Sequence, residues 1–141
     1  MAIHPIEIED HPAAEDVQFL EDQINTFNCE TTGYFDFHPL AIFVRDEQGH
    51  IVAGITGGMW GGCCEIKFLW VHEDLRRQGY GTRLMRAAEQ EALAHGYSVI
   101  VLSSHSFQAP GFYQKLGYEV VGEAEGYPRA HSLIHLRKEL A

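Results

Sequence analysis

The sequence lacks several features, and each absence excludes a class of protein. Its 141 residues hold only three cysteines, Cys29, Cys63 and Cys64. An odd number with two adjacent members fits neither a disulfide framework nor a Cys-x-x-Cys metal site, so a reducing cytoplasm is the expected location. No run approaches the ~18 apolar residues of a membrane span, and the N-terminus lacks the basic and apolar stretches of a signal peptide. We therefore expect no membrane partner.

Basic residues are scarce as well. Ten Lys and Arg stand against 20 Asp and Glu, for a formal net charge of −10. Such a field repels nucleic acid and anionic membranes, so neither is an expected partner, and it leaves a cationic partner open. Residues 1–44 contain no Lys or Arg and carry nine of the carboxylates, a charge of −9. These are Glu7, Glu9, Asp10, Glu15, Asp16, Glu21, Asp22, Glu30 and Asp36.

A metal site is not expected. The nine histidines are scattered, and only His131 and His135 have a ligand-like spacing. On the predicted last strand these two would face solvent on one side of the sheet.

The length fits one domain, residues 1–141, which can bury a core without disulfides or metal. Apolar spacing predicts one or two short helices over residues 13–28. Two β-rich runs, residues 40–45 and 51–56, are joined by a turn sequence. A second turn, marked by Gly57, Gly58, Gly61 and Gly62, leads to a strand over residues 64–71. This part of the chain reads as an antiparallel meander.

The pattern changes after Val71. Residues 82–95 have helical periodicity and end before Gly96, and residues 97–103 form a short β-branched run. Strand, helix and strand over residues 64–103 therefore predict a parallel βαβ crossover. A second helix is expected over residues 109–116, followed by strands near 119–122 and 131–137. The fold class is mixed α/β (α+β).

The turn inside the crossover, residues 76–82, is the main candidate for ligand binding. Its sequence is Arg-Arg-Gln-Gly-Tyr-Gly-Thr, between a strand and a helix. Glycines allow several backbone N–H groups to point into one concavity at the positive end of the helix dipole, which suits phosphate oxygens. A plain tight turn with solvated arginines is the alternative. The spacing matches neither a P-loop nor a dinucleotide fingerprint.

These residues resemble the GNAT superfamily of acetyl-coenzyme A (acetyl-CoA) dependent N-acetyltransferases. Its motif Gln/Arg-x-x-Gly-x-Gly/Ala is matched by Arg76, Gly79 and Gly81, and its motif Ala-x-x-x-Tyr-x-Lys-x-Gly-Phe/Tyr by Ala109 to Tyr118. The resemblance covers roughly residues 40–140. It implies a mixed central sheet with helices on both faces, splayed between the family's fourth and fifth strands, which here end near Val71 and Ser103.

The resemblance also implies a cofactor site for acetyl-CoA, with no metal. The amides of residues 77–82 would bind the pyrophosphate, and Leu69 and Val71 would pair with the pantetheine arm like an added strand. The implied cofactor contacts are Leu69, Val71, Arg76, Arg77, Gln78, Gly79, Tyr80, Gly81, Thr82, Ser106 and Tyr113. Ser106 stands where family members often have Asn, and its hydroxyl offers one donor instead of two.

Three groups are candidates for chemistry by the same resemblance. The Leu69 amide would polarise the thioester carbonyl, and Tyr113 would protonate the departing thiolate. Glu65 matches the general-base glutamate of the histone-acetylating branch, but an exposed carboxylate paired with Lys67 is an equally good interpretation. Glu30, Asp36 and His105 are the other base candidates.

The expected function is transfer of acetyl from acetyl-CoA to a primary amine, in a ternary complex. The acceptor would be a small-molecule or peptide amine, and the charge of residues 1–44 favours a cationic one such as a polyamine, an aminoglycoside-like amine or a lysine side chain. A solvated acidic surface explains that charge equally well. The alternative function is a non-catalytic acyl-CoA-binding sensor or interaction domain; another acyl donor, or a protein- or nucleic-acid-linked amine, also stays open. The sequence allows for a homodimer.

Overall fold

The computed structural model describes residues 3–140, which divide into two compact units between Phe35 and Asp36. In the first unit, α1 runs over Ala14–Thr32 as one continuous helix, four residues longer than predicted at its C-terminal end. It stops at Gly33, whose φ of 77° is left-handed and whose N–H bonds the carbonyl of Cys29. None of its residues is buried.

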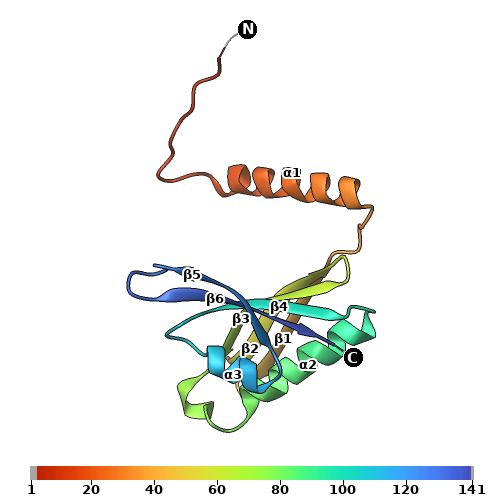
Figure 1. The fold of residues 1–141 in the computed structure, drawn as a ribbon, viewed down its shortest axis with the longest axis vertical. Coiled ribbons are helices and arrows are strands. Elements are labelled where there is room, and N and C mark those ends of the chain that lie inside the picture. The colour runs from red at the N-terminus through yellow and green to blue at the C-terminus, as the bar shows by residue number, and fades with distance from the viewer. Residues whose placement is uncertain (1–2, 141) are drawn as a thin grey trace. The chain divides into compact units, whose positions relative to one another are not determined.

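The second unit is a six-stranded mixed sheet with two α-helices (Figure 1). Its strand order is β1-β2-β3-β4-β6-β5, with β3 and β4 parallel and the other neighbours antiparallel. The elements are β1 (His38–Arg45), β2 (Ile51–Trp60), β3 (Cys63–Val71), the short 3-10 helix η1 (Glu73–Leu75), α2 (Tyr80–Ala94), β4 (Val99–His105), α3 (Pro110–Lys115), β5 (Glu119–Glu125) and β6 (Ser132–Glu139). The predicted meander and βαβ crossover are confirmed.

One predicted turn is shorter than the sequence predicts. Gly57 and Gly58 lie inside β2, and only Gly61 and Gly62 form the turn into β3. A Cβ placed on Gly57 would overlap the carbonyl oxygen of Glu65 on β3. This glycine therefore permits a close approach of two strands and does not end β2 as the sequence predicts.

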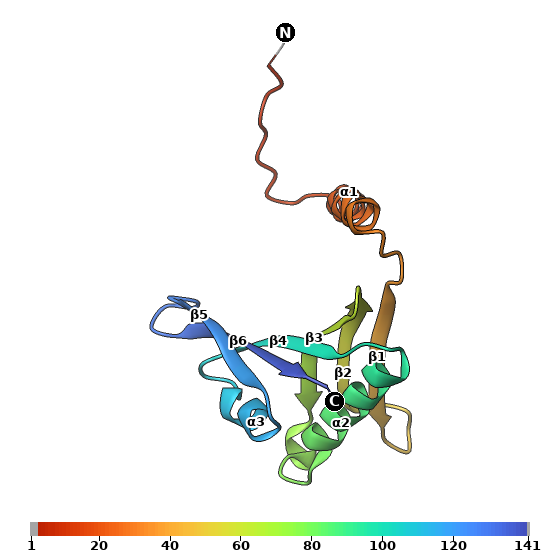
Figure 2. The same cartoon turned by 45° about the vertical axis from the view of Figure 1, so that its right-hand side comes forward.

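One face of the sheet is covered. Figures 1 and 2 show α2 and α3 on the same side, where apolar side chains of the sheet form the core with α2. Its largest fully buried side chains include Ile55, Met59, Met85, Ile100 and Leu136. We call the other side the open face; it carries exposed aromatic side chains such as Phe43, Phe68 and Trp70. Within residues 36–140 the helices occupy one face, so helices on both faces stay a prediction. No helix among residues 3–140 is long and apolar enough to cross a membrane.

A buried ion pair joins α2 to the C-terminal strands. Glu89 is only 7% exposed and accepts hydrogen bonds from Tyr118 (2.9 Å), Arg86 (2.9 Å) and the ammonium of Lys138 (3.1 and 3.2 Å). Lys138 also donates to the carbonyl of Leu116 at the end of α3 (2.8 Å). Burial alone would raise the pKa of Glu89, but the three donors outweigh it and hold that pKa below its ordinary value. The cluster fixes α3 against α2 and β6.

Replacing Glu89 with Ala should lower the free energy of unfolding at pH 7 by about 3–5 kcal/mol, because it leaves the half-buried Lys138 ammonium without its carboxylate partner. Since the folded pKa of Glu89 is lowered, its contribution is present above the ordinary value of 4.5 and is lost as pH falls through the folded value. Urea unfolding from pH 7 to pH 3 measures both effects.

Glu91→Ala is the matched control, because Glu91 lies on the same helix but forms an exposed pair with His95 (3.0 Å). It should change the free energy of unfolding by less than about 1 kcal/mol. Equal losses in the two variants would contradict the role given to Glu89.

Candidate active site

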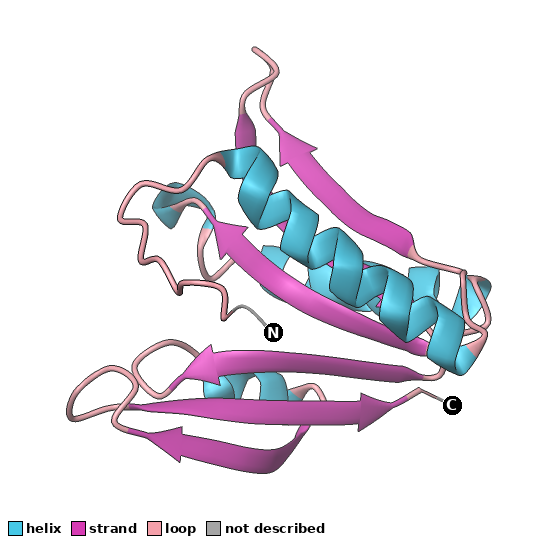
Figure 3. Cartoon of the chain, turned by 90° about the horizontal axis from the view of Figure 1, so that it is seen from above, coloured by secondary structure: helices cyan, strands magenta, loops and turns pink. Residues whose placement is uncertain are grey.

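The site begins where β3 and β4 stop pairing. The two strands pair only from Cys63–Val99 to Ile66–Leu102, although β3 continues to Val71. Figure 3 shows the sheet as two groups of strands that separate along part of their length. The separation predicted between the strands ending near Val71 and Ser103 is thus present, and it falls between the third and fourth strands of this chain.

A β-bulge lies at the same place. On β2, Thr56 pairs with Phe68 and Gly57 with Ile66, so Lys67 is an extra residue in β3. The bulge reverses the alternation of the strand: Glu65 lies on the open face, whereas Leu69 and Val71 pack toward the helix-covered core. The side chain of Glu65, before the bulge, and those of Leu69 and Val71, after it, therefore point to opposite faces of the sheet.

The backbone groups of Leu69 and Val71 point toward the gap. The N–H of His72 bonds the carbonyl of Val52 on β2 (2.8 Å). Because successive residues of a strand direct their N–H and C=O groups to opposite sides, those of Leu69 and Val71 face away from β2. They lie beyond the last β3–β4 pair and can accept an added extended strand.

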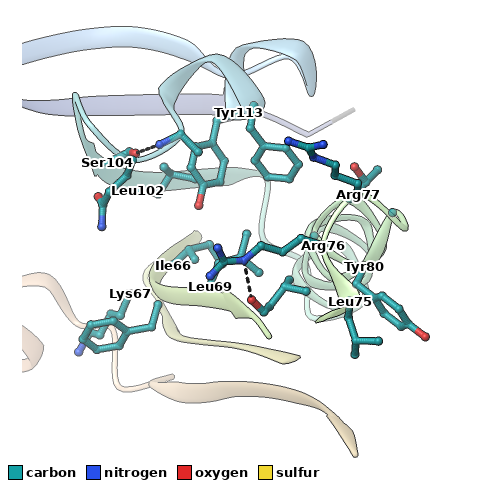
Figure 4. Close-up of a pocket in the computed structure, with 18 of the residues that line it drawn as sticks. Ile66, Lys67, Leu69, Leu75, Arg76, Arg77, Tyr80, Leu102, Ser104 and Tyr113 are labelled. Atoms are coloured by element: carbon teal, nitrogen blue, oxygen red, sulfur yellow. Dashed lines mark hydrogen bonds between the residues drawn. The ribbon is translucent and has the colours of Figure 1, made fainter. Parts of the chain in front are cut away.

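A cleft of about 550 Å³ lies in this gap (Figure 4). It is lined by residues of β3 and β4, by the turn before α2, by the first turn of α2 and by α3. Its lining residues are Ile66, Lys67, Phe68, Leu69, Val71, Leu75, Arg76, Arg77, Gly79, Tyr80, Gly81, Thr82, Leu102, Ser103, Ser104, Gln108, Ala109, Phe112 and Tyr113. The cleft passes between the strands, because both core-facing and open-face side chains line it.

One end of the cleft is built for an anion. Gly79, with φ 83°, immediately precedes α2 in the left-handed region, and Arg77 has φ 64°. These conformations turn the backbone around the N-terminus of a 15-residue helix, where free N–H groups and the helix dipole favour negative charge. Arg77 lines this end, whereas the Arg76 guanidinium donates to the carbonyl of Val71 (3.1 Å) and fastens the turn to β3.

Tyr113 enters the cleft from the opposite wall. It lies on α3, whose first residue is Pro110 and whose start is held to β4 by the N–H of Ala109 bonding the Ser104 hydroxyl (3.3 Å). Figure 4 shows its hydroxyl directed between Leu102 on β4 and Leu69 on β3. Burial raises the pKa of Tyr113, so the phenol keeps its proton at neutral pH and can donate a hydrogen bond.

Three residues expected at the site lie outside the cleft lining. Glu65 is exposed, Gln78 donates to the carbonyl of Asp74 (3.1 Å), and the Ser106 hydroxyl accepts from the N–H of Ser132 (3.0 Å). The other expected cofactor contacts do line it. Glu30 belongs to the first unit, and Asp36 binds the Tyr97 hydroxyl (2.7 Å) and the N–H of Gly61 (3.1 Å).

Sequence reasoning missed several lining residues, among them Phe68, Ser103, Ser104 and Gln108. Ser103 and Ser104 directly follow the last β4 residue paired to β3, and this position at a separating strand end is the signal that would have found them. Gln108 lies two residues from Ser106, the expected pantetheine contact, and its side-chain oxygen accepts from the N–H of His105 (2.7 Å). Among residues 3–140 no group of three or more His, Cys, Asp or Glu could hold a metal ion.

Comparisons with known proteins agree with this geometry. The family model described as "Acetyltransferase (GNAT) family" matches residues 2–118. A blasticidin-S acetyltransferase of Streptomyces morookaense is 31% identical over 77% of this chain and 83% of its own. The crystal structure of an acetyltransferase from Bacillus cereus has a TM-score of 0.80 and 31% identity over 95% of this chain and 98% of its own. An aminoglycoside 6′-N-acetyltransferase complexed with coenzyme A shares the fold, with a TM-score of 0.65 and 19% identity over 92% and 82% of the chains. The chain belongs to the GNAT family and is an acetyltransferase.

Proposed function

We propose that the protein transfers the acetyl group of acetyl-CoA directly to a cationic primary amine, with both substrates bound at once. The observation that carries this proposal is the separation of β3 from β4, which leaves Leu69 and Val71 facing a cleft between an anion-binding turn and Tyr113. Acetyl-CoA has a pyrophosphate for the turn and pantetheine amides for the open strand. Acetyl-CoA supplies the activated thioester.

The residues of the cleft fit the parts of acetyl-CoA in order. The turn at Gly79 would hold the pyrophosphate with its N–H groups, and the Arg77 guanidinium would lie beside the phosphates. The pantetheine amides would bond the backbone of Leu69 and Val71 as an added strand. Since the Val71 carbonyl already accepts from Arg76 (3.1 Å), we assign this pairing to the Leu69 carbonyl and the Val71 N–H, which leaves the Leu69 N–H for the thioester.

The acetyl group would then lie between Leu69 and Tyr113. The Leu69 N–H donates to the thioester oxygen and stabilises the negative charge that develops there as the amine attacks. The Tyr113 hydroxyl donates to the sulfur as the carbon–sulfur bond breaks, and its proton is replaced from water. Leu102 and Phe112 also line the cleft and would give the reacting carbon apolar neighbours.

The acceptor is proposed to be cationic because residues 1–44 carry nine carboxylates and no Lys or Arg. Two proteins similar to this one are named for small-molecule acceptors, a blasticidin-S acetyltransferase and an aminoglycoside 6′-N-acetyltransferase. A thiol-release screen over polyamines, aminoglycosides, lysine peptides and neutral amines tests the activity. Tight binding of acetyl-CoA without thiol release from any amine would contradict the proposal and favour an acyl-CoA sensor.

Gly79→Ala should weaken coenzyme A binding about tenfold, because a left-handed conformation costs a side-chain-bearing residue about 1–2 kcal/mol and the turn must shift to relieve it. Titration calorimetry with coenzyme A measures the change. Gly49→Ala is the control: Gly49 has φ 85° in the β1–β2 turn, so it bears the same strain away from the cleft. If both variants bind coenzyme A equally well, the turn is not the phosphate site.

Tyr113→Phe should lower turnover about 100-fold, as expected for loss of a positioned proton donor. The Michaelis constant for acetyl-CoA should stay nearly unchanged, because the ring still fills its place. Tyr127→Phe, which removes an exposed hydroxyl in the β5–β6 loop, serves as the control. Unchanged turnover in Tyr113→Phe would exclude the acid role.

Neutralising three N-terminal carboxylates should raise the Michaelis constant for a dicationic acceptor several-fold and leave that for a neutral amine unchanged. The variant is Glu15→Gln, Glu21→Gln and Glu30→Gln together, all on α1. The control removes the same charge elsewhere with Glu47→Gln, Glu123→Gln and Glu125→Gln. Added salt should likewise raise the Michaelis constant for the dicationic acceptor and leave that for the neutral amine unchanged. Equal effects of both triple variants on a dication would show that only total charge matters.

A further inference from the structure

The cleft contains no obvious proton acceptor. Its titratable lining residues, among those that the structure describes, are Lys67, Arg76, Arg77, Tyr80 and Tyr113. A primary amine arrives mostly as ammonium, and it must lose a proton before its lone pair can attack. A neutral residue of the lining can connect the amine to a basic group outside the cleft.

Ser103 provides such a connection. It is the first β4 residue after the last pair with β3, it lines the cleft, and it lies on the open face. Its hydroxyl oxygen is 2.8 Å from Nδ1 of His135, its direct cross-strand partner on β6. His135 itself is exposed to solvent and lies outside the cleft lining.

We propose that Ser103 and His135 form the proton path for the acceptor amine, an inference that rests on the proposed acetyl transfer. The Ser103 hydroxyl accepts one proton from the acceptor ammonium and passes its own proton to Nδ1 of His135. The serine ends as it began, the amine becomes neutral, and the imidazole becomes an imidazolium. The exposed ring then releases a proton to water.

Glu65 is less suited to this role. It pairs with Val101, two residues before Ser103, where β3 and β4 still pair and no cleft exists. The bulge at Lys67 separates it further from the cleft-facing part of β3. His105 also lies outside the lining: its Nδ1 contacts the Tyr127 carbonyl (3.0 Å), and its ring stacks on Phe107 (5.3 Å between centroids).

Charged and titratable groups of both signs share the open face with His135. From β3, β4, β5 and β6 they are Cys63, Glu65, His105, Glu119, Arg137 and Glu139, with Lys67 at the bulge of β3. Directly opposite His135 on β5 stands Gly122, where a Cβ would come within 3.6 Å of the ring. This glycine leaves one side of the imidazole open to water.

The test compares pH profiles of kcat/KM for wild type, His135→Gln and Ser103→Ala, with an acceptor whose amine is protonated at neutral pH. Each variant should lose about 100-fold at pH 7, the size expected for general base catalysis, and recover as rising pH deprotonates the free amine. The acidic limb that the wild-type profile owes to this path should be absent from both. Since both residues act in one path, the double variant should be no slower than either single one.

Two controls separate a proton path from a structural role. An acceptor amine that is already neutral at the assay pH should react at nearly the wild-type rate with both variants. His50→Gln, in the exposed β1–β2 turn, should keep the wild-type profile. Equal losses with protonated and neutral acceptors, or an unchanged acidic limb in His135→Gln, would overturn the proton path while leaving the proposed function intact. Absence of thiol release from the wild-type protein with every amine would overturn both.

Discussion

The site depends on the place where the hydrogen bonding between β3 and β4 ends. Parallel strands normally continue to pair until one of them stops. Here both strands continue after Ile66 and Leu102 but no longer pair with each other. The extra residue, Lys67, bends β3 at that point and reverses its alternation. Unpaired backbone is costly unless something bonds it, so this part of β3 is suited to receive an extended ligand.

The rest of the second unit holds this opening in place. The crossover from β3 through α2 brings a helix N-terminus to one end of the gap, and the Arg76 side chain ties the intervening turn to Val71. On the other side, α3 is held by the Ser104 hydroxyl at its start and by Lys138 at its end. Lys138 in turn is paired to the buried Glu89 of α2. A polar cluster remote from the cleft thus sets the position of Tyr113.

The sequence predicted the features that depend on local chemistry. Gly79 just before α2 and Pro110 at the start of α3 are short-range signals, and both helices form close to the expected bounds. The strand order of the meander and crossover follows from hydrophobic runs and turn residues. The two GNAT motifs indicated a family that the comparisons confirm.

Features set by pairing between distant residues could not be predicted in the same way. Simple alternation would place Glu65, Leu69 and Val71 on one face, and only the register between β2 and β3 reveals the bulge that separates them. The contact between Ser103 and His135 joins residues 32 apart through the antiparallel register of β4 and β6. The burial and pairing of Glu89 could not be predicted, because its partners come from separate segments of the chain. The general base was therefore the least predictable part of the site.

The central claim is that the unpaired backbone of β3 is the binding edge for acetyl-CoA. Amide hydrogen exchange of residues Leu69 and Val71, followed by NMR with and without acetyl-CoA, tests it most directly. We expect the Leu69 amide to exchange quickly in the free protein and to become strongly protected when acetyl-CoA binds, while amides within the paired β1–β2 ladder change little. Protection confined to the turn at Gly79, with Leu69 exchanging at the same rate in both states, would contradict the account.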